Sequence, residues 1–527
     1  MIACQSLATR NEGKPLIGDR IKKYNHPAMG RHFVIYWMQQ SQRIIENHAL
    51  AYAIQNANNL DLPVIVIFIM SDGIPDANLR HYHFMLEGIY EVFRGLNDIS
   101  IPAFLFKGSD PELLAALLKQ CALLVTDVGY LHYQKQWREA IRGLAQDNGC
   151  GYFQVESDVI VPLEIASPKE EYSAATLRPK ILEQLSGFLH ETDNPKVLRK
   201  LEHSYMAREI LLDILGSNQS VLSNYSDHSN RSKRSFPLHQ CVSQMSQEEF
   251  IQNALSQLHA EFNTPHIDIE VKPVSNMKGG HSASLQLLHE FIDNKLSQYH
   301  KDRSNPALQN QSYLSPYLHF GQISALEIVL HLLHRFELPP DDITELIKHR
   351  KSEINPYPGL ASYCEELIIR RELSMNFCHY NPDYDNFTSL PNWARQTLIE
   401  HSRDQRFPQY SLDKLECFST RDIYWNAAQK ELVQTGLMHN YMRMYWGKKI
   451  VEWISSPEDA MQVMIYLNNK YALDGRDPNS YAGIAWCLGK HDRPWSSREI
   501  FGKVRYMSFD GLTRKYSMRE YIRRIEN

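Results

Sequence analysis

The sequence predicts two domains, an α/β domain with a doubly wound parallel sheet and a helical domain that follows it. Short, continuously apolar segments alternate with amphipathic segments through the first 160 residues or so. After Gly279-Gly280 the pattern changes, and long amphipathic stretches dominate with few strand signals. The length of 527 residues exceeds what one compact core accommodates, which also favours two domains.

Five segments of the first domain have the character of buried strands. They are rich in Val, Ile, Leu and Phe and lack polar alternation, which is typical of a parallel sheet covered by helices on both faces. We expect strands at His32–Met38, Pro63–Met70, Pro102–Phe106, Ala122–Asp127 and Tyr152–Glu156.

Helical periodicity between these strands predicts the connecting helices of a Rossmann-like domain. We expect helices at Arg43–Asn56, Leu79–Leu96, Pro111–Gln120 and Gln134–Asp147. Such sheets bind ligands at the carboxyl ends of their strands. No G-x-G-x-x-G follows the first strand, so the ordinary dinucleotide fingerprint is missing.

Composition shifts suggest the domain boundaries. We place an N-terminal extension at residues 1–30, the α/β domain at 31–185, an interdomain linker at 186–280 and the helical domain at 281–527. Within the linker, residues 216–246 are rich in Ser and Asn, and we predict that they form an exposed, mobile segment.

Composition also excludes several protein classes. Hydrophobic residues make up 43% of the chain and charged residues 22%, as in ordinary soluble globular proteins. The eight cysteines are scattered without a C-x-x-C pair, which argues against a zinc site or a disulfide framework and favours a reducing compartment. The charged N-terminal segment does not read as a secretory signal, and no apolar run is long enough to cross a membrane, so we expect neither a leader nor a membrane span. We therefore expect a cytoplasmic protein, or a nuclear one in a eukaryote.

The C-terminal segment is basic although the chain as a whole carries a net charge of −5. From Cys487 to Asn527 there are ten Lys/Arg and five Asp/Glu, a local balance of 10 − 5 = +5. Such a segment can contact the phosphates of a nucleic acid. A solvated helix face is the alternative explanation.

The most informative stretch, WNAAQKELVQTGLMHNYMRMYWGKKIVEW, predicts two helices broken at Gly436, with the second resuming at Met438 or His439. It contains three tryptophans. Trp446 and Trp453 are seven residues apart and therefore share one helical stripe. A row of indoles beside Arg443 suits electron transfer, although core packing is the commoner use of tryptophan.

Three further segments carry polar groups in suggestive positions. Ser312 and Ser315 stand at a helix start, where hydroxyl and N–H groups bind phosphate or merely cap the helix, and Tyr299 precedes them. Glu366 and Arg370 are four residues apart, which favours a surface ion pair unless the carboxylate faces a cleft. Asp474 is a candidate partner for Arg443, and it shares a turn-rich segment with Asp477, Asn479 and Trp486.

Taken together, these motifs resemble the cryptochrome/photolyase superfamily, and most closely its class II cyclobutane pyrimidine dimer photolyases. LSPYLHFGQIS (314–324) looks like a flavin-phosphate motif, and EELIIRREL (365–373) is similar to the substrate-pocket helix. WNAAQKELVQTGLMHNYMRMYWGKKIVEW and LDGRDPNSYAGIAWCLGKHDRPW look like class II signatures. VIYWMQQSQRIIENHAL (34–50) and EEYSAATLRPK (170–180) fit the same class, so the resemblance spans nearly the whole chain.

The resemblance implies a light-driven DNA repair enzyme that binds FAD in its helical domain. Tyr299, Ser312, Leu314, Ser315 and Gln322 would hold the phosphates and nearby groups. Arg371, Arg443, Asp474 and Asp477 would line the flavin, and either Asn468 or Asn479 would contact its N5.

The resemblance also assigns roles in repair. Trp446 would be the electron donor next to the flavin, Trp425 the second donor and Trp453 the one at the surface. Glu366, Asn440, Met444 and Trp486 would form the catalytic pocket for a pyrimidine dimer flipped out of double-stranded, UV-damaged DNA. Arg493 and Arg505 would fill the gap left in the duplex or hold its phosphates.

Several alternatives remain at this point. The resemblance implies an antenna chromophore of deazaflavin or folate type in the first domain, but the sequence gives no site for it. A cryptochrome, disfavoured by the short C-terminal segment, and a (6-4) photolyase that uses His439 are alternatives on the same fold. A nucleotide-binding protein without enzymatic activity would leave the tryptophans unexplained. We expect a monomer that binds no membrane.

Overall fold

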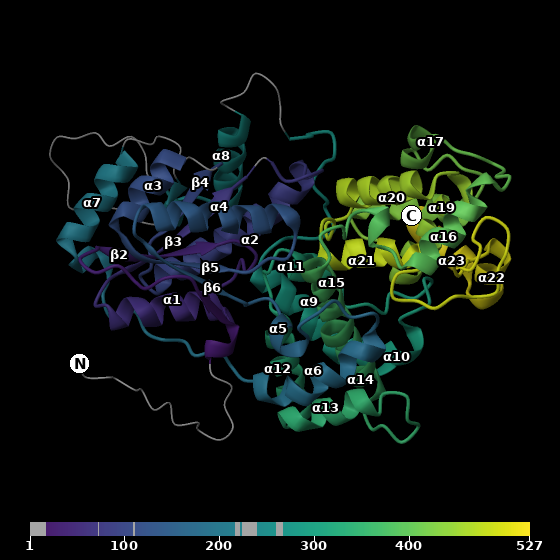
Figure 1. Cartoon of the computed structure of the whole chain (residues 1–527), viewed down its shortest axis with the longest axis horizontal. Coiled ribbons are helices and arrows are strands. Elements are labelled where there is room, and N and C mark those ends of the chain that lie inside the picture. Colours follow the sequence, from purple (N-terminus) through teal and green to yellow (C-terminus); the bar gives the residue numbers. More distant parts are fainter. Residues whose placement is uncertain are drawn as a thin grey trace.

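The computed structural model describes residues 17–71, 73–108, 111–216, 222–223, 240–259 and 267–526. Its first part is a mixed sheet with the strand order β1-β6-β5-β2-β3-β4-β7-β8 (Figure 1). The five central strands run parallel, and the edge strand β1 is antiparallel to β6. The strands are β1 (Ile21–Lys23), β2 (Phe33–Met38), β3 (Val64–Met70), β4 (Ala103–Lys107), β5 (Cys121–Asp127), β6 (Gly151–Val155), β7 (Leu222–Ser223) and β8 (Gln240–Cys241).

Both faces of the sheet are covered, as the apolar strands predict. On β2, Tyr36 belongs to the core that contains α1 (His48–Asn59) and α2 (Leu79–Asp98). Its neighbour Trp37 belongs to the opposite core with α3 (Pro111–Gln120) and α4 (His132–Asp147). Successive side chains of a strand point to opposite faces, so this division follows directly from the strand geometry. The predicted doubly wound sheet is confirmed.

The order in which strands join the sheet changes direction between β2 and β5, which makes this the topological switch point. β2 leads to β3 and β4 on one side, whereas β5 and β6 lie on the other side. The buried Asp127 at the end of β5 holds the segment that follows β2 in place, because its carboxylate accepts the backbone N–H groups of Gln39, Gln40 and Ser41. A crevice at such a switch point is the usual ligand site of an open α/β sheet.

Two local predictions differ from the structure. The first helix begins at His48, not at Arg43, because the side chain of Asn47 caps it by accepting the N–H of Leu50. Arg43 is instead buried in the preceding loop, where it donates to the carbonyl groups of Glu46 and Ser157. The last part of the proposed N-terminal extension, Ile21–Lys23, joins the sheet as β1.

The proposed linker is partly folded onto the first domain. α7 (Tyr205–Gly216) packs on the side of α3, and α8 (Gln247–His259) packs on α2, where Phe250 contacts Phe93. Between them, β7 pairs with the edge of β4. Most of the Ser/Asn-rich segment 216–246 lies outside the described residues, so its predicted mobility stays a prediction.

The rest of the chain is helical, as predicted, and contains a π-helical turn at Glu365–Arg370. After α5 (Leu163–Ala166) and α6 (Ala174–Phe188), the helices are α9 (His281–Asn294), α10 (Tyr299–Asp302), α11 (Ser315–His319), α12 (Ala325–Phe336), α13 (Pro340–Lys348), α14 (Pro358–Cys364), α15 (Arg371–Tyr380), α16 (Asn392–Glu400), α17 (Leu412–Glu416), α18 (Ile423–Thr435), α19 (Asn440–Trp453), α20 (Pro457–Tyr471), α21 (Pro478–Cys487), α22 (Phe509–Lys515) and α23 (Met518–Glu526).

The predicted break at Gly436 is confirmed. Gly436 follows α18 with a φ of 72°, a conformation that glycine adopts without a Cβ penalty. His439 then caps α19, so that helix starts at Asn440, one or two residues later than the expected start at Met438 or His439.

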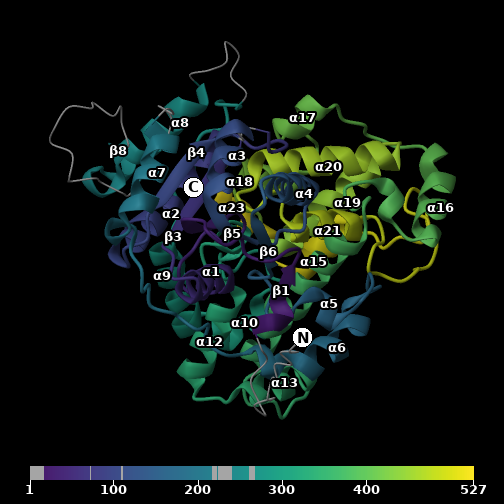
Figure 2. The ribbon, with the colours of Figure 1, turned by 60° about the vertical axis from the view of Figure 1, so that its left-hand side comes forward.

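Buried polar contacts join the two parts of the chain. The guanidinium of Arg80 on α2 donates to the carbonyl groups of Val433 and Tyr471 at 2.7 Å each, at the ends of α18 and α20. Figure 2, in which the sheet comes forward, shows α20 to the right of β3 and β4. No helix among the described residues is long and apolar enough to cross a membrane.

Candidate flavin, DNA and chromophore sites

The predicted flavin residues converge on helix α21, which packs against both α15 and α19. Asp477 caps α21 by accepting the N–H of Asn479 at 2.8 Å. The same carboxylate lies 3.2 Å from Nδ1 of His319 on α11. Burial opposes ionisation of Asp477, but the hydrogen bond from His319 and the charge of Arg371 outweigh it and hold the pKa of Asp477 below its usual value.

Two arginines beside α21 are paired with carboxylates. Arg443 Nη2 donates to Asp474 Oδ1 at 3.0 Å, which confirms the predicted contact. Arg371 is buried, and its Nη2 donates to Asp158 Oδ1 at 2.7 Å. Asp158 follows β6, so the start of α15 is tied to the first domain. Fixed, partly desolvated charges of this kind can tune the electronics of a bound heterocycle.

The two candidate asparagines differ in their hydrogen bonding. The side-chain amide of Asn479 is engaged at both ends, since its Oδ1 accepts from Ser374 and its Nδ2 donates to Asp477. Asn468 on α20 is 3% exposed, and its Nδ2 has no hydrogen-bond partner within the described part of the chain. A buried donor without a partner is costly, which points to a ligand atom at this position.

The residues expected near the flavin phosphates lie around α10, α11 and α14. The ring of Tyr299 meets that of Tyr363 edge-on at 5.4 Å. Ser312 and Ser315 flank the buried Leu314 at the start of α11. Gln322 differs from the others, because its amide oxygen accepts from the Gly280 N–H and its amide nitrogen donates to the Phe84 carbonyl. Gln322 therefore braces α2 against the start of α9.

The four predicted catalytic residues come from three elements, of which α19 and α21 pack against each other. Glu366, in the π-helical turn, lies 2.7 Å from Arg303 and 3.2 Å from Arg370, which confirms the expected pair with Arg370 and adds a second arginine. π-helical turns occur frequently at functional sites. The remaining three are Asn440, exposed at the start of α19, the half-buried Met444 one turn later, and the half-buried Trp486 on α21.

The three tryptophans form a continuous contact chain across α18 and α19. The rings of Trp446 and Trp425 are nearly parallel, with planes 6° apart and centroids 6.4 Å apart. Trp425 then meets Trp453 at 5.3 Å with an angle of 69°. Both indole N–H groups are fixed, since Trp425 donates to the Trp446 carbonyl and Trp446 donates to Gln429 Oε1. The rings contact one another in the order Trp446, Trp425, Trp453, and their role as electron donors stays a prediction.

The predicted surface position of Trp453 is wrong. Its side chain is only 3% exposed because it packs within the core of the helical domain. The half-buried Tyr410 lies against it, with ring centroids 4.9 Å apart and planes at 81°. Sequence spacing places residues on a helical stripe but does not show which neighbouring loop covers that stripe.

The basic C-terminal segment is an exposed surface. Arg493 and Arg505 are exposed, and their guanidinium carbons lie 5.5 and 5.1 Å from the ring centroid of Trp495, which is 41% exposed. The exposed cations in this segment are Arg493, Arg498, Lys503, Arg505, Arg514, Lys515, Arg519 and Arg523. This face can attract a phosphate backbone and offers an aromatic ring for stacking.

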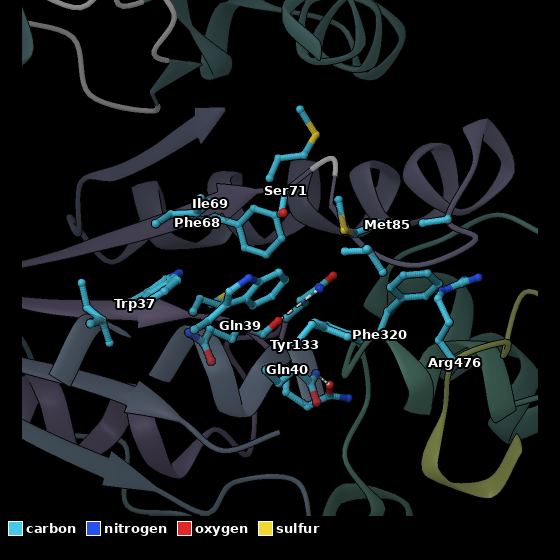
Figure 3. A pocket seen from close by; sticks show the side chains of 18 of the residues that line it. Trp37, Gln39, Gln40, Phe68, Ile69, Ser71, Met85, Tyr133, Phe320 and Arg476 are labelled. Atoms are coloured by element: carbon cyan, nitrogen blue, oxygen red, sulfur yellow. Dashed lines mark hydrogen bonds between the residues drawn. The ribbon is translucent and has the colours of Figure 1, made fainter. Parts of the chain in front are cut away.

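A pocket of about 300 Å³ lies at the switch point of the sheet and extends to the helical domain. Figure 3 shows Trp37 at one end of it and Phe320 with Arg476 at the other. Gln39 is buried, and neither polar atom of its side-chain amide has a partner among the described residues; the same holds for Nη2 of Arg476. The sequence did not reveal this pocket because its walls come from segments more than 400 residues apart.

Among the described residues, no group of three or more His, Cys, Asp or Glu side chains is placed to hold a metal ion. The sites above are instead suited to an organic cofactor, a nucleic acid and a planar chromophore.

Comparison with known proteins assigns the family. Residues 34–196 match the family model described as DNA photolyase. The chain is 41% identical over 509 residues to the deoxyribodipyrimidine photo-lyase of Methanothermobacter thermautotrophicus, covering 96% of this chain and 98% of that one. The chain belongs to the DNA photolyase family.

Solved photolyase structures share the fold. A bacterial class III photolyase from Agrobacterium tumefaciens matches with a TM-score of 0.64 at 17% identity, over 94% of this chain and 87% of that one. An archaeal photolyase from Sulfolobus tokodaii, crystallised with two FAD molecules, matches with a TM-score of 0.61 at 14% identity, over 93% of this chain and 89% of that one. The membership agrees with the family resemblance of the sequence motifs.

Proposed function

We infer that this photolyase-family protein is a deoxyribodipyrimidine photo-lyase, an enzyme that uses light to repair pyrimidine dimers in DNA. The observation that carries this inference is the full-length similarity to a relative of that name. We further propose that the enzyme belongs to class II and that its substrate is the cyclobutane dimer. The class II sequence signatures around the tryptophans support this finer assignment.

The helical domain has the features needed to hold FAD. When bound and reduced, FAD supplies the excited-state electron that opens the cyclobutane ring and takes it back afterwards. The unpartnered Nδ2 of Asn468 favours this residue over Asn479 as the contact of flavin N5. Arg371, Arg443, Asp474 and Asp477 would supply fixed charges to the flavin ring, and Tyr299, Ser312, Leu314 and Ser315 would hold its phosphates. Gln322 supports this site from the domain interface.

The lesion pocket is formed by Trp486, Met444, Asn440 and Glu366. A flipped dimer stacks on the half-buried ring of Trp486 and packs on Met444, while Asn440 and Glu366 offer polar contacts to the base edges. Arg303 and Arg370 hold the Glu366 carboxylate in place. Damaged bases pair and stack poorly, which reduces the cost of flipping them from the duplex and contributes to selectivity.

Trp446, Trp425 and Trp453 would pass electrons toward a resting, oxidised flavin in the light. Their successive ring contacts support this role, and Tyr410 extends the contacts beyond Trp453. This path is separate from repair itself, because repair starts from a flavin that is already reduced.

We assign the pocket at the switch point to a light-harvesting chromophore. Its aromatic walls, among them Trp37, Tyr133 and Phe320, suit a flat heterocycle, and the unpartnered polar atoms of Gln39 and Arg476 suit that heterocycle's carbonyl and N–H groups. The archaeal photolyase with two FAD molecules, described as implying a novel light-harvesting cofactor, is consistent with a second chromophore on this fold. Deazaflavin and folate types are the candidate chromophores.

A (6-4) photolyase is disfavoured by the environment of His439. That reaction requires proton transfer through histidine, but His439 acts here as the cap of α19, with its Nδ1 accepting the N–H of Tyr441 at 3.2 Å. Burial lowers the pKa of His439 to about 3, so the imidazole is neutral near pH 7 and is a poor proton donor.

Lesion choice tests this proposal. FAD-loaded, chemically reduced protein is illuminated with one oligonucleotide that carries a cyclobutane thymine dimer and another that carries a (6-4) photoproduct. We expect repair of the first and none of the second. Repair of the (6-4) photoproduct alone would contradict the assignment of substrate and the capping role given to His439.

We also propose that the enzyme acts as a monomer on double-stranded, UV-damaged DNA, in the cytoplasm or in the nucleus of a eukaryote. The exposed cations of the C-terminal segment support DNA as the partner, with Arg493 and Arg505 at the gap left by the flipped dimer.

A further inference from the structure

A short segment of the first domain reaches the loop that carries Arg493. Residues Glu170–Tyr172, here called the brace, lie between α5 and α6 and run beside α15. The N–H of Glu171 donates to Asn376 Oδ1 at 2.8 Å, and Asn376 Nδ2 donates to the Lys169 carbonyl at 3.0 Å. The brace is therefore fixed to a helix of the flavin domain.

The brace contacts three consecutive residues that lie about 320 positions later in the sequence. The carboxylate of Glu170 forms an ion pair with Lys490, which is 8% exposed. The carbonyl of Tyr172 accepts from Nδ1 of His491 at 2.8 Å, and the hydroxyl of Tyr172 donates to the carbonyl of Asp492 at 2.6 Å. Arg493 follows immediately.

The loop of residues 489–493 needs these contacts because its backbone is strained. His491 has a φ of 58°, a left-handed conformation that non-glycine residues rarely adopt, and Gly489 has a φ of 106°. Burial lowers the pKa of His491 to about 4, so near neutral pH its ring is uncharged. A neutral imidazole can donate to the Tyr172 carbonyl only when its proton is on Nδ1, so this contact fixes the tautomer of His491.

We propose that the brace positions Arg493 for its contact with DNA, in addition to any role of the brace in folding. The proposal rests on the DNA-binding role of Arg493 proposed above. Ordering a loop on binding costs conformational entropy, and a loop held in its bound shape beforehand avoids that cost. The brace is thus a positioning element in the first domain for a DNA contact made by the second.

Tyr172→Phe is the sharpest test because it removes one hydroxyl from a side chain that is 51% exposed. FAD-loaded protein is titrated in the dark with a duplex that carries one cyclobutane dimer, and Kd is measured at several salt concentrations. Loss of one hydrogen bond predicts binding about 3- to 10-fold weaker. The slope of log Kd against log salt stays unchanged because no phosphate contact is removed.

Tyr380→Phe is a matched control. The hydroxyl of Tyr380 donates to the Ser167 carbonyl at 2.7 Å, so this variant also removes a tyrosine hydrogen bond near the brace but leaves residues 490–492 untouched. We expect it to bind DNA as the parent protein does. A merely structural role of Tyr172 would instead lower thermal stability and weaken binding equally in both variants, which would overturn the proposal.

A double-mutant cycle with Arg493→Ala separates the proposal from its premise. If the brace acts through Arg493, Tyr172→Phe has little further effect once the arginine is gone, whereas additive losses would overturn positioning. If Arg493→Ala weakens binding and Tyr172→Phe does not, Arg493 binds DNA but the brace does not position it. If Arg493→Ala binds as tightly as the parent, the DNA role of Arg493 is wrong and the positioning proposal falls with it.

Discussion

Trp425 and Trp446 stack with their planes only 6° apart, although they belong to different helices and lie 21 residues apart in the sequence. The hydrogen bond from the Trp425 indole to the Trp446 carbonyl fixes this geometry at 3.0 Å. Two parallel, buried rings in contact, each with its polar N–H satisfied, are the rigid contact that the proposed electron-transfer path requires.

Replacing Trp446 therefore separates two light reactions. In Trp446→Phe we expect light to fail to reduce the oxidised flavin, because the proposed first donor is gone, whereas chemically reduced protein still repairs dimers. Flavin absorbance under illumination measures the first reaction, and thymine absorbance measures the second. Equal loss of both would show that Trp446 is needed for structure and does not act as an electron donor. Trp393→Phe, outside the contact chain, is the matched control.

The lesion pocket predicts a loss of binding without a loss of cofactor. Stacking of a base on an aromatic ring contributes about 1–3 kcal/mol, so Trp486→Ala should weaken binding of dimer-containing DNA by roughly 5- to 150-fold. Combining it with Glu366→Ala should abolish repair while the flavin spectrum is retained. Unchanged repair by the double variant would contradict the pocket assignment.

The salt dependence of DNA binding tests the basic face. Each phosphate contact adds about 0.9 to the slope of log Kd against log salt, so Arg505→Ala should reduce that slope by about one contact and weaken binding of dimer-containing DNA. Arg335, exposed on α12 and paired with Asp293, offers a control, because Arg335→Ala should leave the slope as it is.

A buried carboxyl predicts how stability changes with pH. Burial raises the pKa of Glu372 to about 8, although its Oε1 accepts the N–H of Ile160 at 2.7 Å. Above the unfolded pKa of about 4.3, the native state holds a proton that the unfolded chain has lost, so stability falls as pH rises toward 8. Glu372→Gln mimics the protonated form and should flatten this fall.

Denaturant unfolding between pH 6 and pH 9 measures the effect of Glu372→Gln. If the free energy of unfolding changes with pH equally in the variant and the parent protein, Glu372 does not titrate in this range. The nearby Glu156, whose pKa burial raises to about 7, would then be the first alternative source of the slope.

Local sequence patterns predicted the parts of the fold that depend on local physics. The apolar strands of the sheet and the glycine break at Gly436 follow from side-chain period and backbone conformation. β1 was missed because Ile-Lys-Lys is short and polar, and its strand exists only through pairing with β6. The buried position of Trp453 and the brace at Tyr172 depend on distant loops, which no local pattern encodes.

In the candidate site, too, some features follow from local sequence patterns and others depend on the tertiary structure. The Arg443–Asp474 pair and the Glu366–Arg370 pair were predicted because charge and spacing suggest partners. The choice between Asn468 and Asn479 required the hydrogen-bond partners of each amide, and the pocket between Trp37 and Arg476 required the tertiary arrangement of both domains.

Light-dependent repair is the most direct test of the central claim. Purified, chemically reduced, FAD-loaded protein is mixed with an oligonucleotide that carries one cyclobutane thymine dimer, and thymine absorbance is followed under blue light and in the dark. We predict that absorbance returns only in the light. No return in the light, with reduced FAD still bound, would contradict the assignment as a cyclobutane dimer photolyase.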